Sequence, residues 1–407
     1  MKRRQFLDSA GISVLCALAG TGCTITRFAG NRGSPVAAQD TRAGYLARML
    51  DELCPDLKPR PAGSEAYNAA ATIVLREMRN ALPVAWLDTF TFEYWNLLNE
   101  PSLFIGDRRI ESYPAIGSLG TPRGGLEGVA VETNDKRIQY KLIDAAGTEM
   151  ANIAVYQGKA ISRSCGPFGR EQKCPPLFII GEQDEPLLRE AAANRIPVRM
   201  NAQVEFVPDT PTSNVIGTIP GKSSEEIIFM AHLDTVRAGP GANDNTASLI
   251  LVLMLAYAVA GTRPKKTLTF VASSCEEIGQ HGSRHYFGRR KKDGTLDRTS
   301  CSFNFDSVTW GPDLIIQTTD DRIREDFQRI GDDVSFPGTV KAVNGDGTII
   351  DNIPLRDTTV RCVYVGSEGS DVMKVWHRPD DIPANVRVDY VEYTYRIFYE
   401  YLTRNIL

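Results

Sequence analysis

The chain has 407 residues, of which 42% are hydrophobic and 24% are charged, and its formal net charge is −4. This length exceeds that of an ordinary single domain and allows a large buried core. Because both signs of charge are mixed and the balance is slightly negative, a nucleic-acid partner is not expected.

The N-terminus has the features of an export signal. Lys2-Arg3-Arg4-Gln5-Phe6-Leu7 precedes an apolar run from Ala10 to Gly22. Paired arginines before a short apolar run indicate a twin-arginine signal. The run is too short and too rich in Gly, Ser and Thr to span a bilayer well. We therefore expect export to the periplasm, to the extracellular space or to the outer face of a membrane.

Two positions could end this signal. Cys23 follows Gly20-Thr-Gly, which is similar to a lipoprotein box, and Val36-Ala-Ala38 offers small residues for cleavage before Gln39. We slightly favour a lipid on Cys23, which would anchor the protein to a membrane through several acyl chains. Residues 1–40 are thus predicted to be signal and linker.

Residues 95–212 are predicted to form an inserted, β-rich α+β domain between two parts of a main domain, residues 41–94 and 213–407. Short β-type runs occupy residues 128–131, 153–156 and 177–180, and residues 185–192 have a helical pattern. Short strands separated by turn residues are typical of such a domain.

The last part of the chain alternates strands with helices. Apolar β-type runs occupy residues 226–231, 267–273, 301–305 and 359–365, and a long apolar helix is expected over residues 249–260. This alternation predicts an α/β fold with a mainly parallel, mixed sheet that has helices on both faces. In such sheets the functional crevice lies outside the carboxyl ends of the strands.

Candidate metal ligands fall at or after those strand ends. The chain has only four histidines, and two of them, with three carboxylates, occupy such positions: His232, Asp244, Glu277, Asp306 and His377. Two imidazoles and three carboxylates are enough to hold two zinc ions that share one carboxylate. Glu276 is a further carboxylate beside this set, as metal-assisted hydrolysis requires of a general base. Each motif alone is weak, and the prediction depends on their ordered combination.

The combination resembles the co-catalytic zinc aminopeptidases of peptidase family M28. The resemblance lies in His232-x-Asp234, Ala-Asn-Asp244-Asn, Glu276-Glu277, Asn-Phe-Asp306, His377-Arg-Pro-Asp-Asp and, near the start of the folded part, Arg60-Pro-Ala-Gly63-Ser64 followed by a helix. The inserted segment is similar in pattern and position to a protease-associated domain, which usually serves as a lid or substrate-access module. The alternative is a structural insertion with no role in substrate choice.

The resemblance implies roles for these residues. Asp244 would bridge two zinc ions, for which cobalt or manganese could substitute. His232 and Asp306 would complete one metal site, and Glu277 and His377 the other. Glu276 would be the general base, and Asp234 would hydrogen-bond the free ring nitrogen of His232. The implied activity is the hydrolysis of N-terminal residues from peptide substrates.

One stretch departs from the family pattern. The family commonly has Ser-Asp-His before the last strand, in a loop near the substrate, whereas this chain has Ile350-Asp351-Asn352. Asp351 is therefore expected to be a structural carboxylate or a partner of a ligand, and substrate contacts in this loop are not predicted.

Other activities of the same scaffold stay open. Glutaminyl-peptide cyclases usually bind one zinc and have a different loop around the bridging aspartate. A carboxypeptidase of the family would need the same ligands. A non-catalytic binding protein would be marked by lost ligands, and this chain has lost none. The sequence predicts neither the residue removed nor the oligomeric state.

Three further features lead to simpler predictions. Cys165 and Cys174 lie in one loop and, after export, could form a disulfide. Cys275 and Cys301 are predicted to be buried small residues. The basic run Arg289-Arg-Lys-Lys292 is predicted to be the solvated end of a helix.

Overall fold

The computed structural model describes residues 42–165, 173–334, 338–369 and 372–407. The expected signal segment, Cys23 and the Val36-Ala-Ala38 cleavage site lie outside these ranges. Among the described residues, no helix has both the length and the apolar character needed to cross a membrane.

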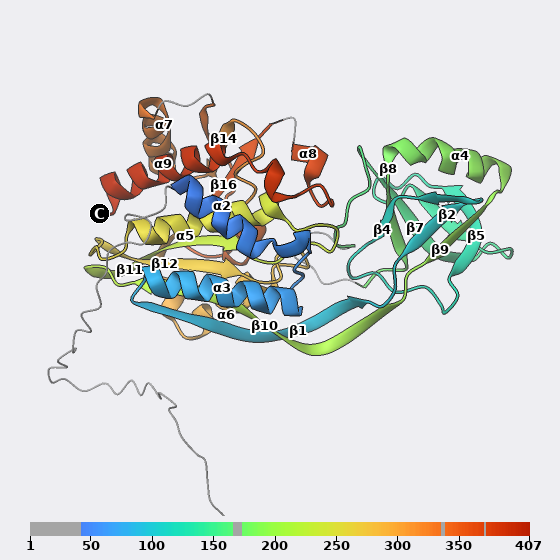
Figure 1. Cartoon of the computed structure of the whole chain (residues 1–407), viewed down its shortest axis with the longest axis horizontal. Coiled ribbons are helices and arrows are strands. Elements are labelled where there is room, and N and C mark those ends of the chain that lie inside the picture. Colours follow the sequence, from blue (N-terminus) through green and yellow to red (C-terminus); the bar gives the residue numbers. More distant parts are fainter. Residues whose placement is uncertain (1–41, 166–172, 335–337, 370–371) are drawn as a thin grey trace, which may run out of the picture. The chain divides into compact units, whose positions relative to one another are not determined.

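An eight-stranded sheet carries the elements that were predicted from the last part of the chain (Figure 1). In spatial order its strands are β1 (Val84–Leu97), β10 (Val204–Ile219), β12 (Lys266–Ser273), β11 (Ser223–His232), β13 (Thr299–Phe305), β16 (Arg361–Glu368), β14 (Asp313–Thr318) and β15 (Val340–Asn344). The central run β12-β11-β13-β16 is parallel throughout, and β14 pairs in parallel with β15. The other pairs are antiparallel. The prediction of a mainly parallel, mixed sheet is confirmed.

Helices cover both faces of this sheet. They are α2 (Arg42–Leu53), α3 (Glu65–Ala81), α5 (Ser248–Ala258), α6 (His281–Lys292), α7 (Asp321–Asp333), α8 (Val372–Val375) and α9 (Val388–Asn405), with short 3-10 turns at Pro55–Leu57, Thr295–Arg298, Ile350–Leu355 and Pro383–Asn385. Side chains of β11 alternate between two cores. Phe229 packs in the core that contains α5 and α9, whereas Met230 packs in the core that contains Tyr286 of α6. This alternation follows from the period of two in a strand.

The apolar helix predicted over residues 249–260 is α5, and it is buried on every side. Each side chain from Leu249 to Ala256 is at most 3% exposed. A helix that is hydrophobic all round is stable only inside the protein. Because α5 begins directly after the loop that holds Asp244, its burial fixes that loop to the core.

The inserted segment forms a second eight-stranded sheet with its own hydrophobic core. Its spatial order is β3 (Arg108–Ile110), β2 (Ser102–Ile105), β9 (Pro197–Asn201), β5 (Leu126–Glu132), β6 (Tyr140–Ile143), β7 (Glu149–Tyr156), β8 (Leu177–Gly181) and β4 (Ser112–Pro114), accompanied by the turn Glu182–Asp184 and α4 (Glu185–Asn194). The long antiparallel pair β1 and β10 carries the chain out of the first sheet and back (Figure 1).

The cysteine predictions have different outcomes. Cys275 and Cys301 are buried, as expected. Cys165 and Cys174 pack against the same small apolar cluster. Their side chains are neighbours, since contact with Cys174 lowers the pKa of Cys165. The disulfide between them stays a prediction.

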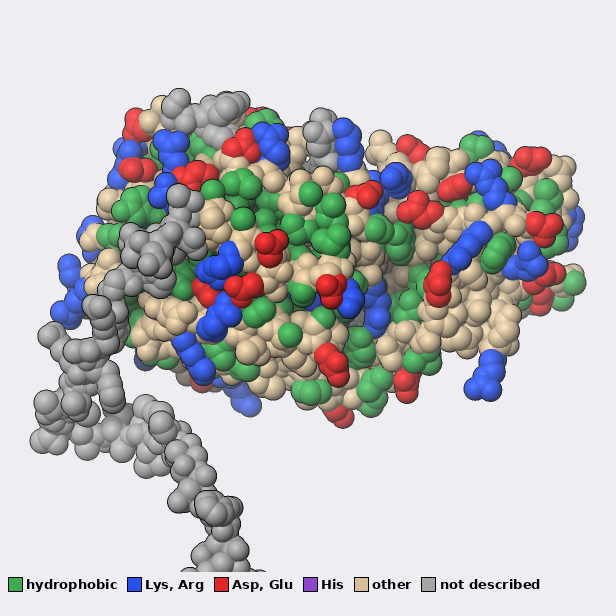
Figure 2. Space-filling view, viewed as in Figure 1, with side chains coloured by type: hydrophobic (Ala, Val, Ile, Leu, Met, Phe, Trp, Pro, Cys, Tyr) green, Lys and Arg blue, Asp and Glu red, His purple; other side chains and the backbone are tan. Residues whose placement is uncertain are grey.

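The charged side chains lie at the surface with both signs intermixed on the face shown in Figure 2. The basic run at the end of α6 follows this pattern, because Arg289, Lys291 and Lys292 are exposed as predicted. Arg290 is the exception. It is partly buried and forms an ion pair with Glu226.

Candidate metal centre

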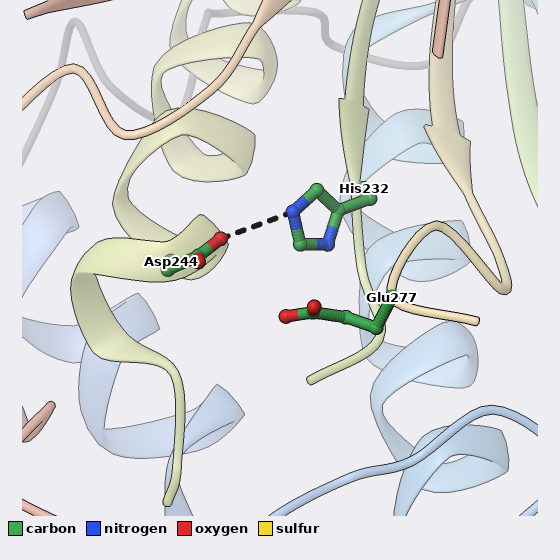
Figure 3. Close-up of side chains that lie close together, drawn as sticks. All are labelled: His232, Asp244 and Glu277. Atoms are coloured by element: carbon green, nitrogen blue, oxygen red, sulfur yellow. Dashed lines mark hydrogen bonds and ion pairs between the residues drawn. The ribbon is translucent and has the colours of Figure 1, made fainter. Parts of the chain in front are cut away.

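The predicted ligands converge beside the carboxyl ends of the parallel strands. His232 is the last residue of β11, Glu277 follows β12, and Asp244 lies in the turn before α5 (Figure 3). One ligand atom from each of these three side chains lies within 4.8 Å of the others. Parallel strands end at one edge of a sheet, and this is why residues 45 positions apart can share a site.

Asp244 lies between two pairs of side chains. Its Oδ1 is 3.1 Å from Nε2 of His232, and its Oδ2 is 3.3 Å from Nε2 of His377. On the first side, Oδ2 of Asp306 is 3.7 Å from the same His232 nitrogen. On the second side, Oε2 of Glu277 is 3.1 Å from the His377 nitrogen. Each oxygen of Asp244 therefore faces one imidazole and one further carboxylate.

This donor set fits divalent cations. All five residues are buried, with at most 9% of each exposed. Buried Oε1 of Glu277 and Nδ1 of His377 have no hydrogen-bond partner among the described residues. Burial and the neighbouring Asp244 raise the pKa of Asp306 to about 7. Burial opposes the charged form of His377, but Glu277 and Asp244 raise its pKa to about 10. The raised pKa of His377 indicates a site that stabilises positive charge, and imidazole and carboxylate are common zinc ligands.

Glu276 lies beside these side chains and makes no ion pair with either histidine among the contacts of the described residues. Its Oε1 accepts a hydrogen bond of 2.8 Å from Nε2 of Gln280. Burial raises the pKa of Glu276 well above its ordinary value. A carboxylate with a raised pKa that is held in place can accept a proton and release it again.

Asp234 differs from the expectation in one respect. Nδ1 of His232 lies 3.0 Å from the backbone carbonyl of Asp234 and 3.8 Å from its carboxylate. The carbonyl can therefore fix the ring tautomer. The carboxylate instead accepts hydrogen bonds from the backbone N–H groups of Glu276 at 3.1 Å and Glu277 at 3.2 Å. Asp234 thus holds the loop of the candidate base.

Asp381 has a matching position on the other side of the centre, and the sequence did not assign it a role. Its carboxylate accepts hydrogen bonds from the backbone N–H groups of Asn243 at 2.7 Å and Asp244 at 3.0 Å. It also accepts one from the side chain of Asn243. The sequence did contain an indication of this role, because Asp381 is the last residue of the motif that begins with the candidate ligand His377.

The contacts of Arg60 explain why its motif accompanies the candidate metal ligands. Its guanidinium is 1% exposed and donates to the backbone carbonyls of Leu233 at 2.7 Å, Pro240 at 2.8 Å and Leu53 at 3.1 Å. It also donates to the hydroxyl of Thr246. One buried side chain therefore ties α2 to the loops that carry His232 and Asp244.

The stretch that departs from the family pattern is buried. Asp351 and Asn352 have no exposed surface. Asp351 accepts a hydrogen bond from the hydroxyl of Ser273, and Asn352 accepts one from Ser302 at 2.8 Å. These side chains contact β12 and β13, and the bond of Asp351 to Ser273 is one that a structural carboxylate would make.

The loop of His377 contacts the inserted domain. The backbone N–H of Ser162 donates to the carbonyl of His377 at 3.1 Å. Arg378 donates to the carbonyls of Lys159 at 2.7 Å and Ala160 at 3.3 Å. The ring of Trp376 stacks on that of His377 with centroids 3.9 Å apart. The inserted domain therefore helps to position this imidazole.

Comparison with known proteins gives a family match. The model of "Peptidase family M28" matches residues 214–402, which contain all five candidate ligands. Aminopeptidase YwaD from Bacillus subtilis is 23% identical over 84% of this chain and 80% of its own length. Carboxypeptidase Q from Mus musculus is 25% identical over 78% of each chain.

Solved structures share the fold. The M28 peptidase precursor from Shewanella amazonensis superposes with a TM-score of 0.71 at 16% identity, covering 88% of this chain and 92% of its own. The zinc aminopeptidase BSAP from Bacillus subtilis gives a TM-score of 0.66 at 18% identity, covering 89% of this chain and 95% of its own. Both alignments extend beyond residues 214–402, so the inserted sheet is included in the similarity.

Proposed function

Residues 214–402 belong to peptidase family M28, and from this premise we propose that the protein is a zinc-dependent exopeptidase that removes N-terminal residues from peptides. The observation that carries the proposal is the position of Asp244. Its two carboxylate oxygens face two different imidazole–carboxylate pairs, at 3.1 Å from His232 and 3.3 Å from His377. This arrangement suits a carboxylate that bridges two cations.

The side chains would have different roles in hydrolysis. His232 and Asp306 would hold one zinc ion, Glu277 and His377 the other, and Asp244 both. When bound, the two ions would polarise the scissile carbonyl and lower the pKa of a water molecule to roughly 7.

Glu276 would take the proton of the attacking water and pass it to the nitrogen of the leaving group. Its hydrogen bond to Gln280 and the backbone contacts of its loop with Asp234 restrict its motion. Such restraint keeps the carboxylate near the reacting atoms, which is what general-base catalysis needs.

The alternatives fit less well. A glutaminyl-peptide cyclase usually needs one zinc, whereas this site offers two facing donor sets. A non-catalytic binding protein would not need a buried carboxylate such as Glu276, which is 5% exposed.

We also propose export by the twin-arginine route, with lipid attachment at Cys23. The paired arginines and the short apolar run near the N-terminus support this proposal.

The proposal is tested by assaying the purified protein against a panel of aminoacyl-amides, with added zinc and after chelation. We expect hydrolysis that chelation abolishes and zinc restores. Hydrolysis that is unaffected by chelation would contradict the metal assignment. Cyclisation of N-terminal glutamine without hydrolysis of any amide would favour the cyclase.

A further inference from the structure

The turn that carries His377 is held by the inserted domain through three consecutive residues. Trp376, His377 and Arg378 follow α8 and lie outside the helices and strands. The backbone carbonyl of His377 accepts a hydrogen bond of 3.1 Å from the N–H of Ser162, which is buried. The residues on either side of His377 make further contacts with the same domain. The position of this candidate ligand therefore depends on a distant part of the chain.

Arg378 joins this turn to the backbone of the inserted domain. The residue is buried, and its Nη2 and Nε donate to the carbonyls of Lys159 at 2.7 Å and Ala160 at 3.3 Å. Its Nη1 donates to the carbonyl of Lys374 at 3.0 Å, on the side of the turn itself. A guanidinium donates in fixed directions, so these contacts restrict the turn more than a flexible ammonium would.

Trp376 joins the turn to an apolar cluster of the inserted domain. The buried members of this cluster are Ala115, Ile161, Leu177 and Ile179. Trp376 packs against the cluster, and its ring centroid is 6.1 Å from that of Tyr156. The same ring stacks on that of His377, with centroids 3.9 Å apart. The imidazole therefore lies on an aromatic ring that is anchored in the inserted domain.

His232 is held by different means. It is the last residue of β11, inside the large sheet, and its Nδ1 lies 3.0 Å from the carbonyl of Asp234. Such a contact at one ring nitrogen orients the other nitrogen toward a metal. Nδ1 of His377 has no hydrogen-bond partner among the described residues, and its backbone φ is 56°, which is uncommon for a residue other than glycine. Its orientation therefore depends on the contacts of its turn.

We propose that the inserted domain is part of the metal centre, with Arg378 and Trp376 as positioning residues for the zinc site of His377. The inference rests on the proposed two-zinc function and adds that the two zinc sites are supported unequally. The site of His232 is held within the large sheet, whereas the site of His377 is held by contacts with the inserted domain. Loss of those contacts should weaken the binding of one zinc ion and leave the other in place.

The test measures zinc binding at each histidine in the wild type and in Arg378→Gln. The chain has only four histidines, so isotope-labelled histidine gives few ring signals in NMR spectra, and His377→Gln and His232→Gln identify two of them. A chelator sets the concentration of free zinc around the full-length protein. In Arg378→Gln the His377 signal should need about 10–100-fold more free zinc than in the wild type, the usual cost of losing a residue that orients a ligand. The His232 signal should respond at the wild-type concentration.

Two further variants separate positioning from overall folding. Trp376→Leu keeps an apolar side chain against the cluster but removes the ring stacked on His377, so it should weaken the same zinc site. It also carries the test if Arg378→Gln does not fold. Lys159→Gln removes an exposed side chain and keeps the carbonyl that Arg378 contacts, so both zinc affinities should stay at the wild-type values. Thermal unfolding of the metal-free proteins checks that each variant folds.

The outcomes are distinguishable. Equal weakening at both histidines in the folded variants, or wild-type zinc affinity at His377 in all of them, would overturn the positioning role and leave the two-zinc function standing. Weakening of the same size in Lys159→Gln would also overturn it, because the effect would then not depend on the carbonyl contact. A wild type in which neither His232 nor His377, or only one of them, responds to zinc would overturn the two-zinc function itself, and this inference with it.

Discussion

The carboxylate of Asp381 accepts the backbone N–H of Asp244 at 3.0 Å, so the candidate bridging residue is held by a side chain 137 positions further along the chain. Asp381 is 2% exposed, and its contacts with the backbone and side chain of Asn243 complete the support. The orientation of Asp244 between the two histidines depends on this contact.

Asp381→Ala should therefore weaken metal binding without removing any ligand. Loss of a residue that orients a metal ligand typically costs about 10–100-fold in affinity or activity. Zinc affinity measured by competition with a chelator checks the magnitude. The neighbouring Asp380→Ala is a matched control, since the side chain of Asp380 is 56% exposed and its ion pair among the described residues is with Lys159 at 3.5 Å. Equal effects of the two substitutions would contradict the role of Asp381.

Glu276→Gln and Glu277→Gln should separate the base from the ligand. Glu276→Gln should keep its metal and its fold but lose roughly 10²–10⁴-fold in kcat, because an amide cannot accept the proton. Glu277→Gln should lose metal first, because Glu277 lies 3.1 Å from the nitrogen of His377 in the candidate site. Metal content and rate are measured on the same samples. If Glu276→Gln loses its metal while Glu277→Gln retains it, Glu276 is the ligand and Glu277 is the base.

The metal-free protein should lose stability as the pH rises from about 4 to about 7. Burial raises the pKa of Asp234, Asp306 and Asp381 to about 7, from an ordinary value of 3.8. Between these values the folded state binds more protons than the unfolded state, so the free energy of unfolding falls with rising pH. Zinc needs deprotonated ligands, so the stabilisation that zinc provides should grow over the same interval.

Thermal unfolding of the chelated and the zinc-loaded protein, at about pH 5 and about pH 8, checks this prediction. The chelated protein should unfold at a lower temperature at the higher pH. The difference in unfolding temperature between the zinc-loaded and the chelated protein should be larger at the higher pH. If this difference in unfolding temperature narrows with rising pH, the assignment of Asp306 as a zinc ligand is contradicted.

The convergence of the five candidate ligands could be predicted from the sequence because strand ends are visible in it. Apolar runs such as Glu226–Ala231 mark buried strands, and the residue that follows, His232, must lie at the edge of the sheet. Parallel strands bring such edges together. The burial of α5 was likewise visible as an unbroken apolar run.

The supporting contacts could not be predicted in this way. The carboxylate of Asp234 contacts the backbone of Glu276 and Glu277, and backbone partners leave no pattern in the sequence. The backbone carbonyls that accept hydrogen bonds from Arg60 likewise leave no pattern in the sequence. The short strands β14 and β15 were not predicted. In β15 only Val340 is buried, whereas in β14 buried and partly buried residues alternate over six positions.

The most direct test of the proposed centre is the zinc content of the purified protein and of Asp244→Asn. If Asp244 bridges two ions, elemental analysis should give close to two zinc ions per chain for the wild type and nearly none for the variant, because a neutral amide cannot offset two dications. A wild-type content of one that does not rise on addition of zinc would contradict the account, as would an Asp244→Asn variant that retains both ions.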